Sequence, residues 1–408
     1  MPRARSINQD DLRNHNLSVV LTTLLHSTTP LSRAQLAKET GLTKATMSLL
    51  AEILLGNGVV EQLAPQQESS NGRPSTPLGF RSGKWAGIGL QINTDGYGYM
   101  VLDIAGKTVA QEWVECDLTN ADPYDAFARL DALVAPVETR LKKRRYRIVG
   151  TGLALPGLVA ADRSLIMAPN LGWSNLELDR FDVVRRLDAV GENEANLAAI
   201  AQVPGYAARR TRAETPLDPN DSFLYISTDV GVGGAIVRSG SVVRGDHGFG
   251  GELGHVSVDM NGPQCRCGRR GCLEMYAGRR ELVRSAGIAE GDEAARPEYA
   301  DELYHRWREG DGKAVRAIEQ ALDAMSSVAV SVINMVDVST IVLGGFWSTF
   351  EEDLTARLRM RIVPQILARY ALNVRVIGCR TVDRPALYGA ACHGLRQFVE
   401  HPVRYLNV

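Results

Sequence analysis

The N-terminal part of the chain carries apolar side chains at a helical spacing. From Leu12 to Ile53 they recur at intervals of three and four, with breaks at a Thr-Pro pair and at Gly41. This pattern predicts three helices. Ser32 and Gln35 form a capping box at the start of the second helix, which ends at Gly41. Two helices joined by the short turn TGLT are typical of a helix-turn-helix, whose second helix lies in the major groove of DNA.

The third predicted helix starts near Thr43 with short or basic side chains that suit contacts with base edges and phosphates. A plain helical bundle with the same capping chemistry is the alternative. The candidate DNA contacts, including one from the preceding helix, are Arg33, Thr43, Lys44, Ala45, Thr46 and Ser48.

Two short β patterns follow, at residues 59–63 and 76–80, around the polar tip PQQESSNGRPS. They predict a wing hairpin with Arg73 near its end, where an arginine enters a minor groove. Residues 1–84 hold nine Lys or Arg and six Asp or Glu, a formal charge of +3. The whole chain carries −1, so the remainder carries −4. This asymmetry favours a DNA-binding head.

After Lys84 the pattern becomes alternating and rich in β-branched residues, with glycine-rich turns. Residues 223–243 repeat the arrangement of strand, glycine-rich turn, strand, tight turn and strand that begins at residue 85. Such an echo suggests two related α/β halves with a cleft between them, where small ligands usually bind. Helical stretches are predicted at 123–143 and 313–335.

Composition sets the broad class. A chain of 408 residues with 45% hydrophobic residues is long enough for two or three cored domains. No apolar signal core opens the sequence and no uninterrupted apolar span follows, which indicates a soluble, cytoplasmic protein without a membrane partner. In that reducing compartment clustered cysteines indicate a metal or a reactive thiol. Cys116, Cys379 and Cys392 stand alone and fit small core positions.

Half of the six cysteines fall in the stretch CRCGRRGCLE at 265–274. Its glycines allow a sharp turn, so that the sulfurs of Cys265, Cys267 and Cys272 can point at one centre. A tetrahedral zinc needs a fourth ligand, and His255 lies ten residues upstream on a predicted strand. Three cysteines and one histidine make a closed, structural site, which would pin a loop without activating water. Three free thiols are the alternative.

Two carboxylates flank this predicted metal loop. Glu252 precedes His255 by three residues, and Glu274 follows Cys272 by two. Ionised carboxylates accept paired hydrogen bonds from vicinal hydroxyls, which suits a sugar ring. A solvated acidic face is the alternative for two glutamates taken alone.

The stretch GFGGELGHVSVDMNGPQCRCGRRGCLE resembles the defining segment of the ROK family of repressors and sugar kinases. The resemblance extends to LPG at 155–157, PNLGW at 169–173 and LGG at 343–345. It implies an α/β, actin-like sugar-kinase fold, which is a ribonuclease H-like duplicated fold, here with an N-terminal winged helix-turn-helix. The head marks the repressor branch of the family.

Carried over residue by residue, the resemblance implies a structural Zn²⁺ on His255, Cys265, Cys267 and Cys272. It implies sugar contacts from residues of both halves, with His255 serving metal and sugar alike. The implied sugar-binding residues are Gly157, Asn170, Asn193, Glu194, Glu252, His255 and Glu274.

Three departures from the family's kinases argue against an enzyme. Glu194 stands where the kinases have the aspartate that takes the sugar's proton, and a general base must lie within hydrogen-bond reach. The first phosphate loop reads Gln91-Ile-Asn-Thr-Asp95, without a lysine. Asp229 stands in the second phosphate loop, where a carboxylate repels nucleotide phosphates.

The sequence therefore predicts a sugar-responsive transcriptional repressor that binds a palindromic operator as a homodimer or tetramer. The stretch NEAN at 193–196 resembles that of xylose-type repressors, which implies a xylose- or glucose-type effector. We expect a head at 1–82, a small half at 83–195 completed by a helix near 388–408, and a large half at 196–387. The alternatives are an ATP-dependent sugar kinase with a DNA-binding head, and a regulator that answers to a partner protein.

Overall fold

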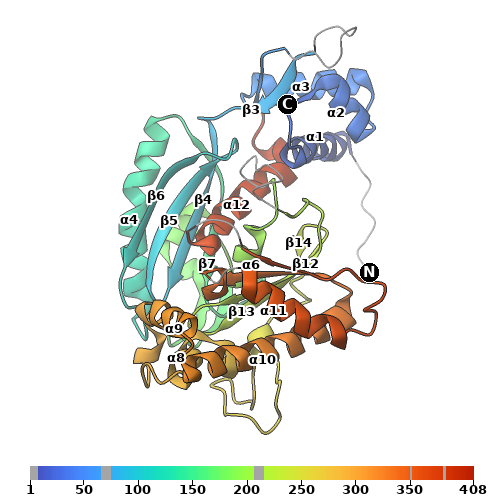
Figure 1. Ribbon diagram of the computed structural model, residues 1–408. Coiled ribbons are helices and arrows are strands. Elements are labelled where there is room, and N and C mark those ends of the chain that lie inside the picture. Colours follow the sequence, from blue (N-terminus) through green and yellow to red (C-terminus); the bar gives the residue numbers. More distant parts are fainter. Residues whose placement is uncertain (1–7, 66–74, 206–215, 350–351, 380–382) are drawn as a thin grey trace. The chain divides into compact units, whose positions relative to one another are not determined.

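The computed structural model describes residues 8–65, 75–205, 216–349, 352–379 and 383–408 (Figure 1). The chain divides into two compact units. Unit 1 comprises Met1–Asn193, Val203–Pro219 and Arg384–Val408, and unit 2 comprises Glu194–Gln202 and Asn220–Asp383. In the described part of the chain, no helix combines the length and apolar character needed to cross a membrane.

The N-terminal helices are α1 (Gln9–His26), α2 (Arg33–Thr40) and α3 (Lys44–Gly56). The capping box at Ser32 is present, and Gly41 ends α2 in the left-handed conformation, as the sequence predicted. A three-stranded antiparallel sheet follows in the order β1 (Leu31–Ser32), β3 (Pro77–Phe80) and β2 (Val60–Gln62). Strands are thus present at both predicted positions, 59–63 and 76–80, whereas the tip with Arg73 lies outside the described residues.

Unit 1 contains a five-stranded sheet in the order β11-β7-β4-β5-β6. Strands β4, β5 and β6 run antiparallel to their neighbours, while β7 and β11 add in parallel. The strands are β4 (Trp85–Asn93), β5 (Gly96–Asp103), β6 (Thr108–Glu115), β7 (Arg147–Leu155) and β11 (Val190–Asn193).

Two helices cover opposite faces of this sheet. Ile88 and Leu90 of β4 belong to the apolar cluster that includes Phe127 and Leu130 of α4 (Pro123–Lys143). The intervening glycines face the C-terminal helix α12 (Pro385–Glu400) at very short range. A Cβ on Gly89 would lie 2.4 Å from the backbone oxygen of Leu387. The helix therefore packs directly on the strand backbone, which only glycine permits.

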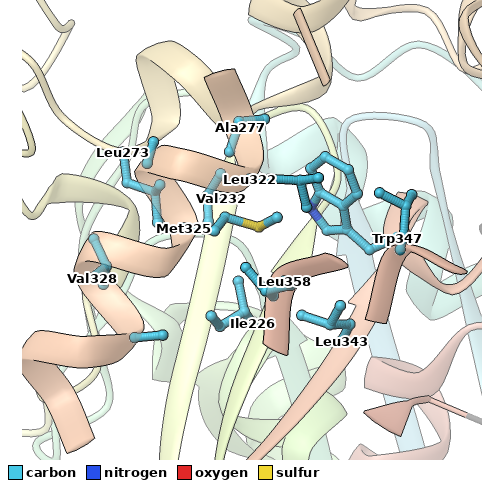
Figure 2. Packing of buried hydrophobic residues seen from close by; sticks show 14 of the residues in the cluster. Ile226, Val232, Leu273, Ala277, Leu322, Met325, Val328, Leu343, Trp347 and Leu358 are labelled. Carbon is cyan, nitrogen blue, oxygen red and sulfur yellow. The ribbon is translucent and has the colours of Figure 1, made fainter. Parts of the chain in front are cut away.

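Unit 2 repeats this sheet in the order β14-β13-β12-β15-β16, again with three antiparallel and two added parallel strands. The duplication expected from the sequence echo is thus present. Figure 2 shows the core on one face of the sheet, where β12, β13 and β15 meet α7, α10 and α11 through residues such as Ile226 and Met325. The strands are β12 (Phe223–Thr228), β13 (Val232–Arg238), β14 (Ser241–Val242), β15 (Thr340–Gly345) and β16 (Arg375–Gly378).

The remaining elements are shorter or lie on the periphery, apart from the long helix α10. In unit 1 they are β8 (Leu158–Val159), β9 (Ser164–Ala168), β10 (Trp173–Glu177) and α5 (Asp182–Leu187). In unit 2 they are α6 (Glu194–Ile200), α7 (Glu274–Ala277), α8 (Arg279–Ser285), α9 (Glu298–Arg308), α10 (Gly312–Val336) and α11 (Glu352–Ile362).

Candidate functional site

The predicted metal ligands come together in unit 2. One donor atom from each of His255, Cys265, Cys267 and Cys272 lies within 4.8 Å of all the others. The Cys265 sulfur is 3.8 Å from His255 Nδ1, and the Cys267 and Cys272 sulfurs are 3.6 Å apart. A tetrahedral zinc with bonds of 2.0–2.3 Å needs donor separations of roughly 3.5–3.8 Å. The four side chains therefore form a candidate metal centre whose chemistry and spacing fit zinc.

Backbone bonds hold the cysteine loop in this shape. Cys265 N–H donates to the oxygen of Arg269 at 2.8 Å, and Gly268 N–H donates back to Cys265 at 3.1 Å. Gly271 adopts φ +64°, and a Cβ there would collide with the backbone of Asp259. The prediction of a strand at His255 is wrong. The residue ends a 3-10 turn (Leu253–His255), because its backbone N–H donates to the oxygen of Glu252 at 3.2 Å and the N–H of Val256 donates to the oxygen of Leu253 at 3.1 Å.

Glu252 and Glu274 lie near the candidate metal centre. Burial raises the pKa of Glu252, with the neighbouring Glu274 adding to the rise and His255 opposing it. Glu274 opens α7, and its Oε2 accepts a 3.4 Å hydrogen bond from the N–H of Val232. A Cβ on Gly231 would lie 2.0 Å from that oxygen. The glycine-rich turn between β12 and β13 therefore leaves the space that the Glu274 carboxylate occupies.

The core fixes the position of α7. Leu273 and Ala277, on either side of Glu274, point into the apolar cluster beside Leu322 and Met325 of α10 (Figure 2). Both are fully buried. The carboxylate of Glu274 is thus carried by a short helix that is anchored at each end.

The second predicted phosphate loop carries an ion pair that the sequence did not reveal. The Asp229 carboxylate lies 2.8 Å from the guanidinium of Arg279, whose side chain is only 10% exposed. The hydroxyl of Thr228 donates to the oxygen of Ala277 at 3.0 Å and accepts from the indole of Trp347 at 2.7 Å. Asp229 is therefore neutralised, which weakens the electrostatic argument against phosphates that the sequence suggested.

Of the sugar-binding residues predicted in unit 1, Asn193 and Gly157 are in contact. The side-chain amide of Asn193, at the end of β11, donates to the oxygen of Gly157 at 2.8 Å. Gly157 has φ +98°, and a Cβ there would lie 2.1 Å from the oxygen of Met167. Asn170 follows two residues after β9, in the turn to β10. The boundary between the units passes between Asn193 and Glu194, which begins α6.

The first predicted phosphate loop is the turn between β4 and β5. It has no lysine, but a cation reaches it from the start of α12. Arg384 lies 3.1 Å from the Asp95 carboxylate and 3.6 Å from the centre of the Trp113 ring. Arg384 itself adopts φ +58°, uncommon for a residue other than glycine. No pattern in the sequence predicted this contact, which joins residues 289 positions apart.

The predicted DNA contacts lie at the start of α3 and are largely exposed. Thr43 caps the helix, accepting from Thr46 N–H at 3.1 Å, while Lys44, Ala45 and Ser48 are exposed. The guanidinium of Arg33 is held 2.8 Å from the Glu52 carboxylate of α3. Leu49 was not predicted as a contact, yet 60% of it is exposed on the same helix. An exposed apolar side chain in a recognition helix suits the methyl group of thymine.

Two asparagines of the N-terminal helices hold the C-terminal segment. Asn57, at the end of α3, donates to the oxygen of Asn407 at 3.0 Å and accepts from its N–H at 3.0 Å. Asn14 of α1 donates to the oxygen of Glu400 at 2.9 Å and accepts from Val403 N–H at 3.3 Å. These reciprocal pairs, which we call the asparagine clamps, tie the N-terminal helices to the end of α12.

The chain is similar in sequence to known repressors and sugar kinases. The family model described as "ROK family" matches residues 88–395. The xylose repressor of Caldicellulosiruptor bescii is 24% identical over 409 residues, covering 96% of this chain and 98% of that protein. The xylose repressor of Bacillus subtilis is 28% identical over 68% of this chain and 69% of its own length. The glucokinase of Thermotoga maritima is 28% identical over 59% of this chain and 77% of its length.

A solved ROK family transcriptional regulator, described as a homolog of the Escherichia coli MLC protein, superposes with a TM-score of 0.76 at 21% identity, covering 96% of this chain and 98% of that one. A ROK family glucokinase from Streptomyces griseus, solved with glucose and AMPPNP, superposes at 0.60 over 75% of this chain. Both likenesses concern the fold. The match of the family model to three quarters of the residues, with the duplicated sheet and the cysteine loop, identifies this chain as a member of the ROK family.

Proposed function

We propose that this protein is a sugar-responsive transcriptional repressor. The proposal rests on one observation: the chain combines a ROK domain with two N-terminal helices, α2 and α3. The first turns of α3 are exposed. The similarity to the Caldicellulosiruptor xylose repressor extends over 96% of this chain, so it includes these helices.

We infer that α2, α3 and the strands β2 and β3 form a winged helix-turn-helix. Helix α3 would enter the major groove and present Lys44, Ala45 and Ser48 to base edges, with Thr43 and Thr46 near the phosphates. The pair between Arg33 and Glu52 fixes α2 against α3. Arg73 is proposed to contact the wing side of the duplex. Two such heads in a homodimer or tetramer would match a palindromic operator.

The proposed sugar contacts of unit 2 are Glu194, Glu252, Glu274 and the ring of His255, whose Nδ1 lies 3.8 Å from the Cys265 sulfur. Zn²⁺ on the four ligands would hold the loop that carries His255 and supply no catalysis. The proposed sugar contacts of unit 1 are Gly157, Asn170 and Asn193. A xylose- or glucose-type monosaccharide fits this collection of acceptors and amides.

The asparagine clamps could transmit the effect of sugar binding from helix α12 to the N-terminal helices. Helix α12 lies on β4 and β7, begins at Arg384 beside the β4–β5 turn, and ends in the segment held by Asn14 and Asn57. A sugar that favours one position of α12 would alter how the head is held. A coupling of about 1–3 kcal/mol changes operator affinity roughly 5- to 150-fold.

A sugar kinase with a DNA-binding head is the second candidate, favoured by the similarity to glucokinases. Glu194 in the place of the family's aspartate and the absence of a lysine in the first loop argue against it. The charge of Asp229 does not count against a kinase, because Arg279 pairs with that carboxylate. Release of ADP that depends on a sugar and is abolished by Glu194→Gln would establish the kinase instead.

The test starts with selection of binding sequences from random duplex DNA, followed by a thermal-shift screen of monosaccharides and their phosphates with and without ATP. We expect a palindromic sequence and one stabilising sugar that releases it. Glu274→Gln should weaken the binding of that sugar by about tenfold or more, which corresponds to about 1.4 kcal/mol, because a charged hydrogen-bond acceptor is lost. The exposed Glu290→Gln is the matched control and should leave the affinity unchanged. Failure to select any DNA sequence would refute the proposal.

A further inference from the structure

One surface of unit 1 concentrates positive charge outside the N-terminal helices. The stretch Arg140-Leu-Lys-Lys-Arg-Arg-Tyr-Arg147, which joins α4 to β7, holds six cations in eight residues and no carboxylate, in a chain whose net charge is −1. All six cationic residues are exposed. We define the basic patch as Arg81, Lys84, Arg140, Lys142, Lys143, Arg144, Arg145 and Arg147.

The cations of the patch lack carboxylate partners, unlike other arginines of the same unit. Within the described residues, none of the eight forms an ion pair. Arg163, by contrast, lies 3.1 Å from Asp179 and 2.5 Å from Asp188. Like charges that gather without partners repel each other and oppose folding, so a charged partner outside the chain would relieve them.

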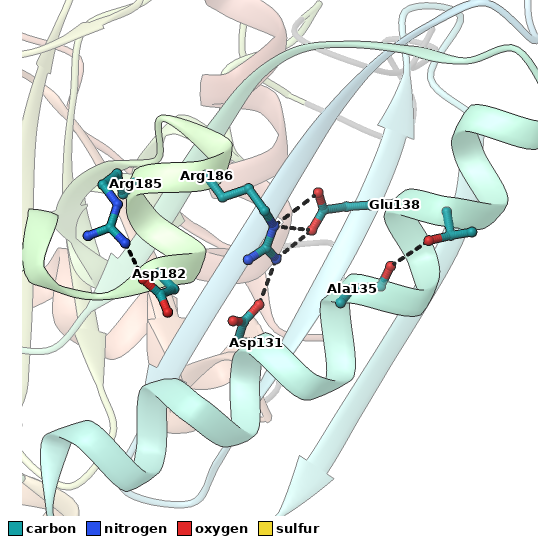
Figure 3. Close-up of polar contacts among 7 residues, drawn as sticks. Asp131, Ala135, Glu138, Asp182, Arg185 and Arg186 are labelled. Atoms are coloured by element: carbon teal, nitrogen blue, oxygen red, sulfur yellow. Dashed lines mark hydrogen bonds and ion pairs between the residues drawn. The ribbon is translucent and has the colours of Figure 1, made fainter.

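Helix α4 carries its carboxylates ahead of a basic last turn. Asp125 lies 2.7 Å from Arg129, and Asp131 and Glu138 both lie 2.6 Å from the guanidinium of Arg186 on α5 (Figure 3). A run of basic residues follows in the last turn of the helix. Glu112 is the nearby exception. It lines a hollow of about 330 Å³ together with Tyr99, Arg140 and Arg144. Each carboxylate of α4 is therefore engaged by Arg129 or Arg186, and none pairs with a cation of the patch.

The patch is continuous with the end of α3. Arg147 N–H donates to the oxygen of Lys84 at 2.6 Å, and the two cations lie 5.4 and 5.3 Å from the centre of the Trp85 ring. Burial lowers the pKa of Lys84, and the charges of Arg147 and Arg81 lower it further. Lys84 Nζ donates to the oxygen of Asn57, the C-cap of α3, at 2.5 Å.

We propose that the basic patch is a second DNA-contacting surface, which binds phosphates of the duplex flanking the segment read by α3. This inference rests on the proposed function. Helix α3 has 13 residues and is therefore about 20 Å long. The patch starts at the end remote from Lys44, so it is placed for backbone phosphates rather than for the same base edges. Lysine and arginine contacts to phosphates add affinity without sequence preference.

The test compares two duplexes that carry the selected operator, one ending at the palindrome and one with twelve more base pairs on each side. The variant replaces Lys142, Lys143, Arg144 and Arg145 by glutamine. For the longer duplex we expect a salt dependence shallower by about 0.9 in logarithmic slope per lost phosphate contact, so about 2–4 in total. For the shorter duplex, affinity and sequence preference should stay unchanged.

The control removes three exposed cations from unit 2, with Lys313, Arg316 and Arg369 replaced by glutamine, and its loss of slope is compared with that of the variant per cation removed. An equal loss of salt-dependence slope in this control would show that net charge alone causes the effect, and would overturn the proposal. An equal loss of slope on the short and the long duplex would overturn it in the same way. The proposal would also fail, with the proposed function intact, if the quadruple variant bound both duplexes with the wild-type salt dependence. A wild-type protein that selects no DNA overturns both. Unfolding curves that coincide confirm that the glutamines leave the fold in place.

Discussion

In unit 1 a helix from the far end of the chain closes one face of the five-stranded sheet, whereas in unit 2 the strands of an equivalent sheet lead into the cysteine loop and α7. Both sheets have the same strand order and direction. In unit 1 the glycines of β4 and β7 meet the backbone of α12. In unit 2 Gly231 meets the carboxylate of Glu274. The two copies of the sheet therefore use their glycines differently. In unit 1 the glycines allow a helix to pack directly on the strands, and in unit 2 a glycine leaves room for a carboxylate.

The largest effect should come from breaking unit 2 alone. Cys272→Ser removes a buried ligand from the candidate metal centre. Structural zinc sites contribute folding free energy, so we expect loss of the metal, a lower unfolding temperature and at least tenfold weaker sugar binding. Mass spectrometry measures the metal content. Calorimetry measures the unfolding temperature and the affinity for the sugar.

The control is Cys116→Ser, which belongs to unit 1 and is not one of the four candidate ligands. Operator binding without sugar should persist in the Cys272 variant, because the head belongs to unit 1. A variant that retains one equivalent of zinc would contradict the assignment of this ligand.

A smaller effect is expected from breaking unit 1 alone. A Cβ on Gly152 of β7 would lie 2.4 Å from the backbone oxygen of Ala390 on α12. Gly152→Ala should therefore lower the free energy of unfolding by about 1–3 kcal/mol through overpacking. Urea denaturation followed by tryptophan fluorescence measures this.

Gly378→Ala is the matched control, since that strand glycine has open space around its Cα. We expect its stability to stay within about 1 kcal/mol of the wild type, consistent with the loss of glycine flexibility alone. Equal destabilisation by both substitutions would show that the packing of α12 is not the cause.

The smallest effect concerns the link itself. Asn57→Ala removes both hydrogen bonds to Asn407, each worth about 0.5–1.5 kcal/mol. We expect the sugar to change operator affinity less in this variant than in the wild type, while sugar binding itself stays normal. Fluorescence anisotropy of a labelled operator, with and without sugar, measures the coupling.

Asn57→Asp keeps the acceptor for Asn407 N–H and loses the donor, so its coupling should fall between the two. Full coupling in Asn57→Ala would show that the signal bypasses this clamp.

Local patterns in the sequence were enough to predict the N-terminal helices, the two long helices α4 and α10 and the strands of the leading hairpins. The apolar spacing of residues 123–143 matches α4, and the capping box at Ser32 marks the start of α2. The close spacing of three cysteines, with a histidine ten residues away, predicted side chains that the structure brings together. In each case the signal lies within a short stretch of chain, where hydrogen bonds and helical or strand period act directly on neighbours.

What the sequence did not predict depends on contacts between distant residues. The pairs of Asn57 with Asn407 and of Arg384 with Asp95 join positions 350 and 289 residues apart. The pair of Asp229 with Arg279 changed the meaning of a residue whose position had been interpreted alone. A lone asparagine or arginine has no periodicity, so only the tertiary fold shows its partner.

The discontinuity of unit 1 has a consequence for biosynthesis. Its sheet is complete once β11 has left the ribosome, yet the helix that covers Gly87, Gly89 and Gly152 is made only after the whole of unit 2. Until then one face of the nascent sheet lacks its cover, and such exposed surfaces favour aggregation. The N-terminal helices likewise wait for Asn407 before the clamp at Asn57 can close. On a ribosome stalled after unit 2, the N-terminal helices would therefore be fully translated but would lack the hydrogen bonds between Asn57 and Asn407.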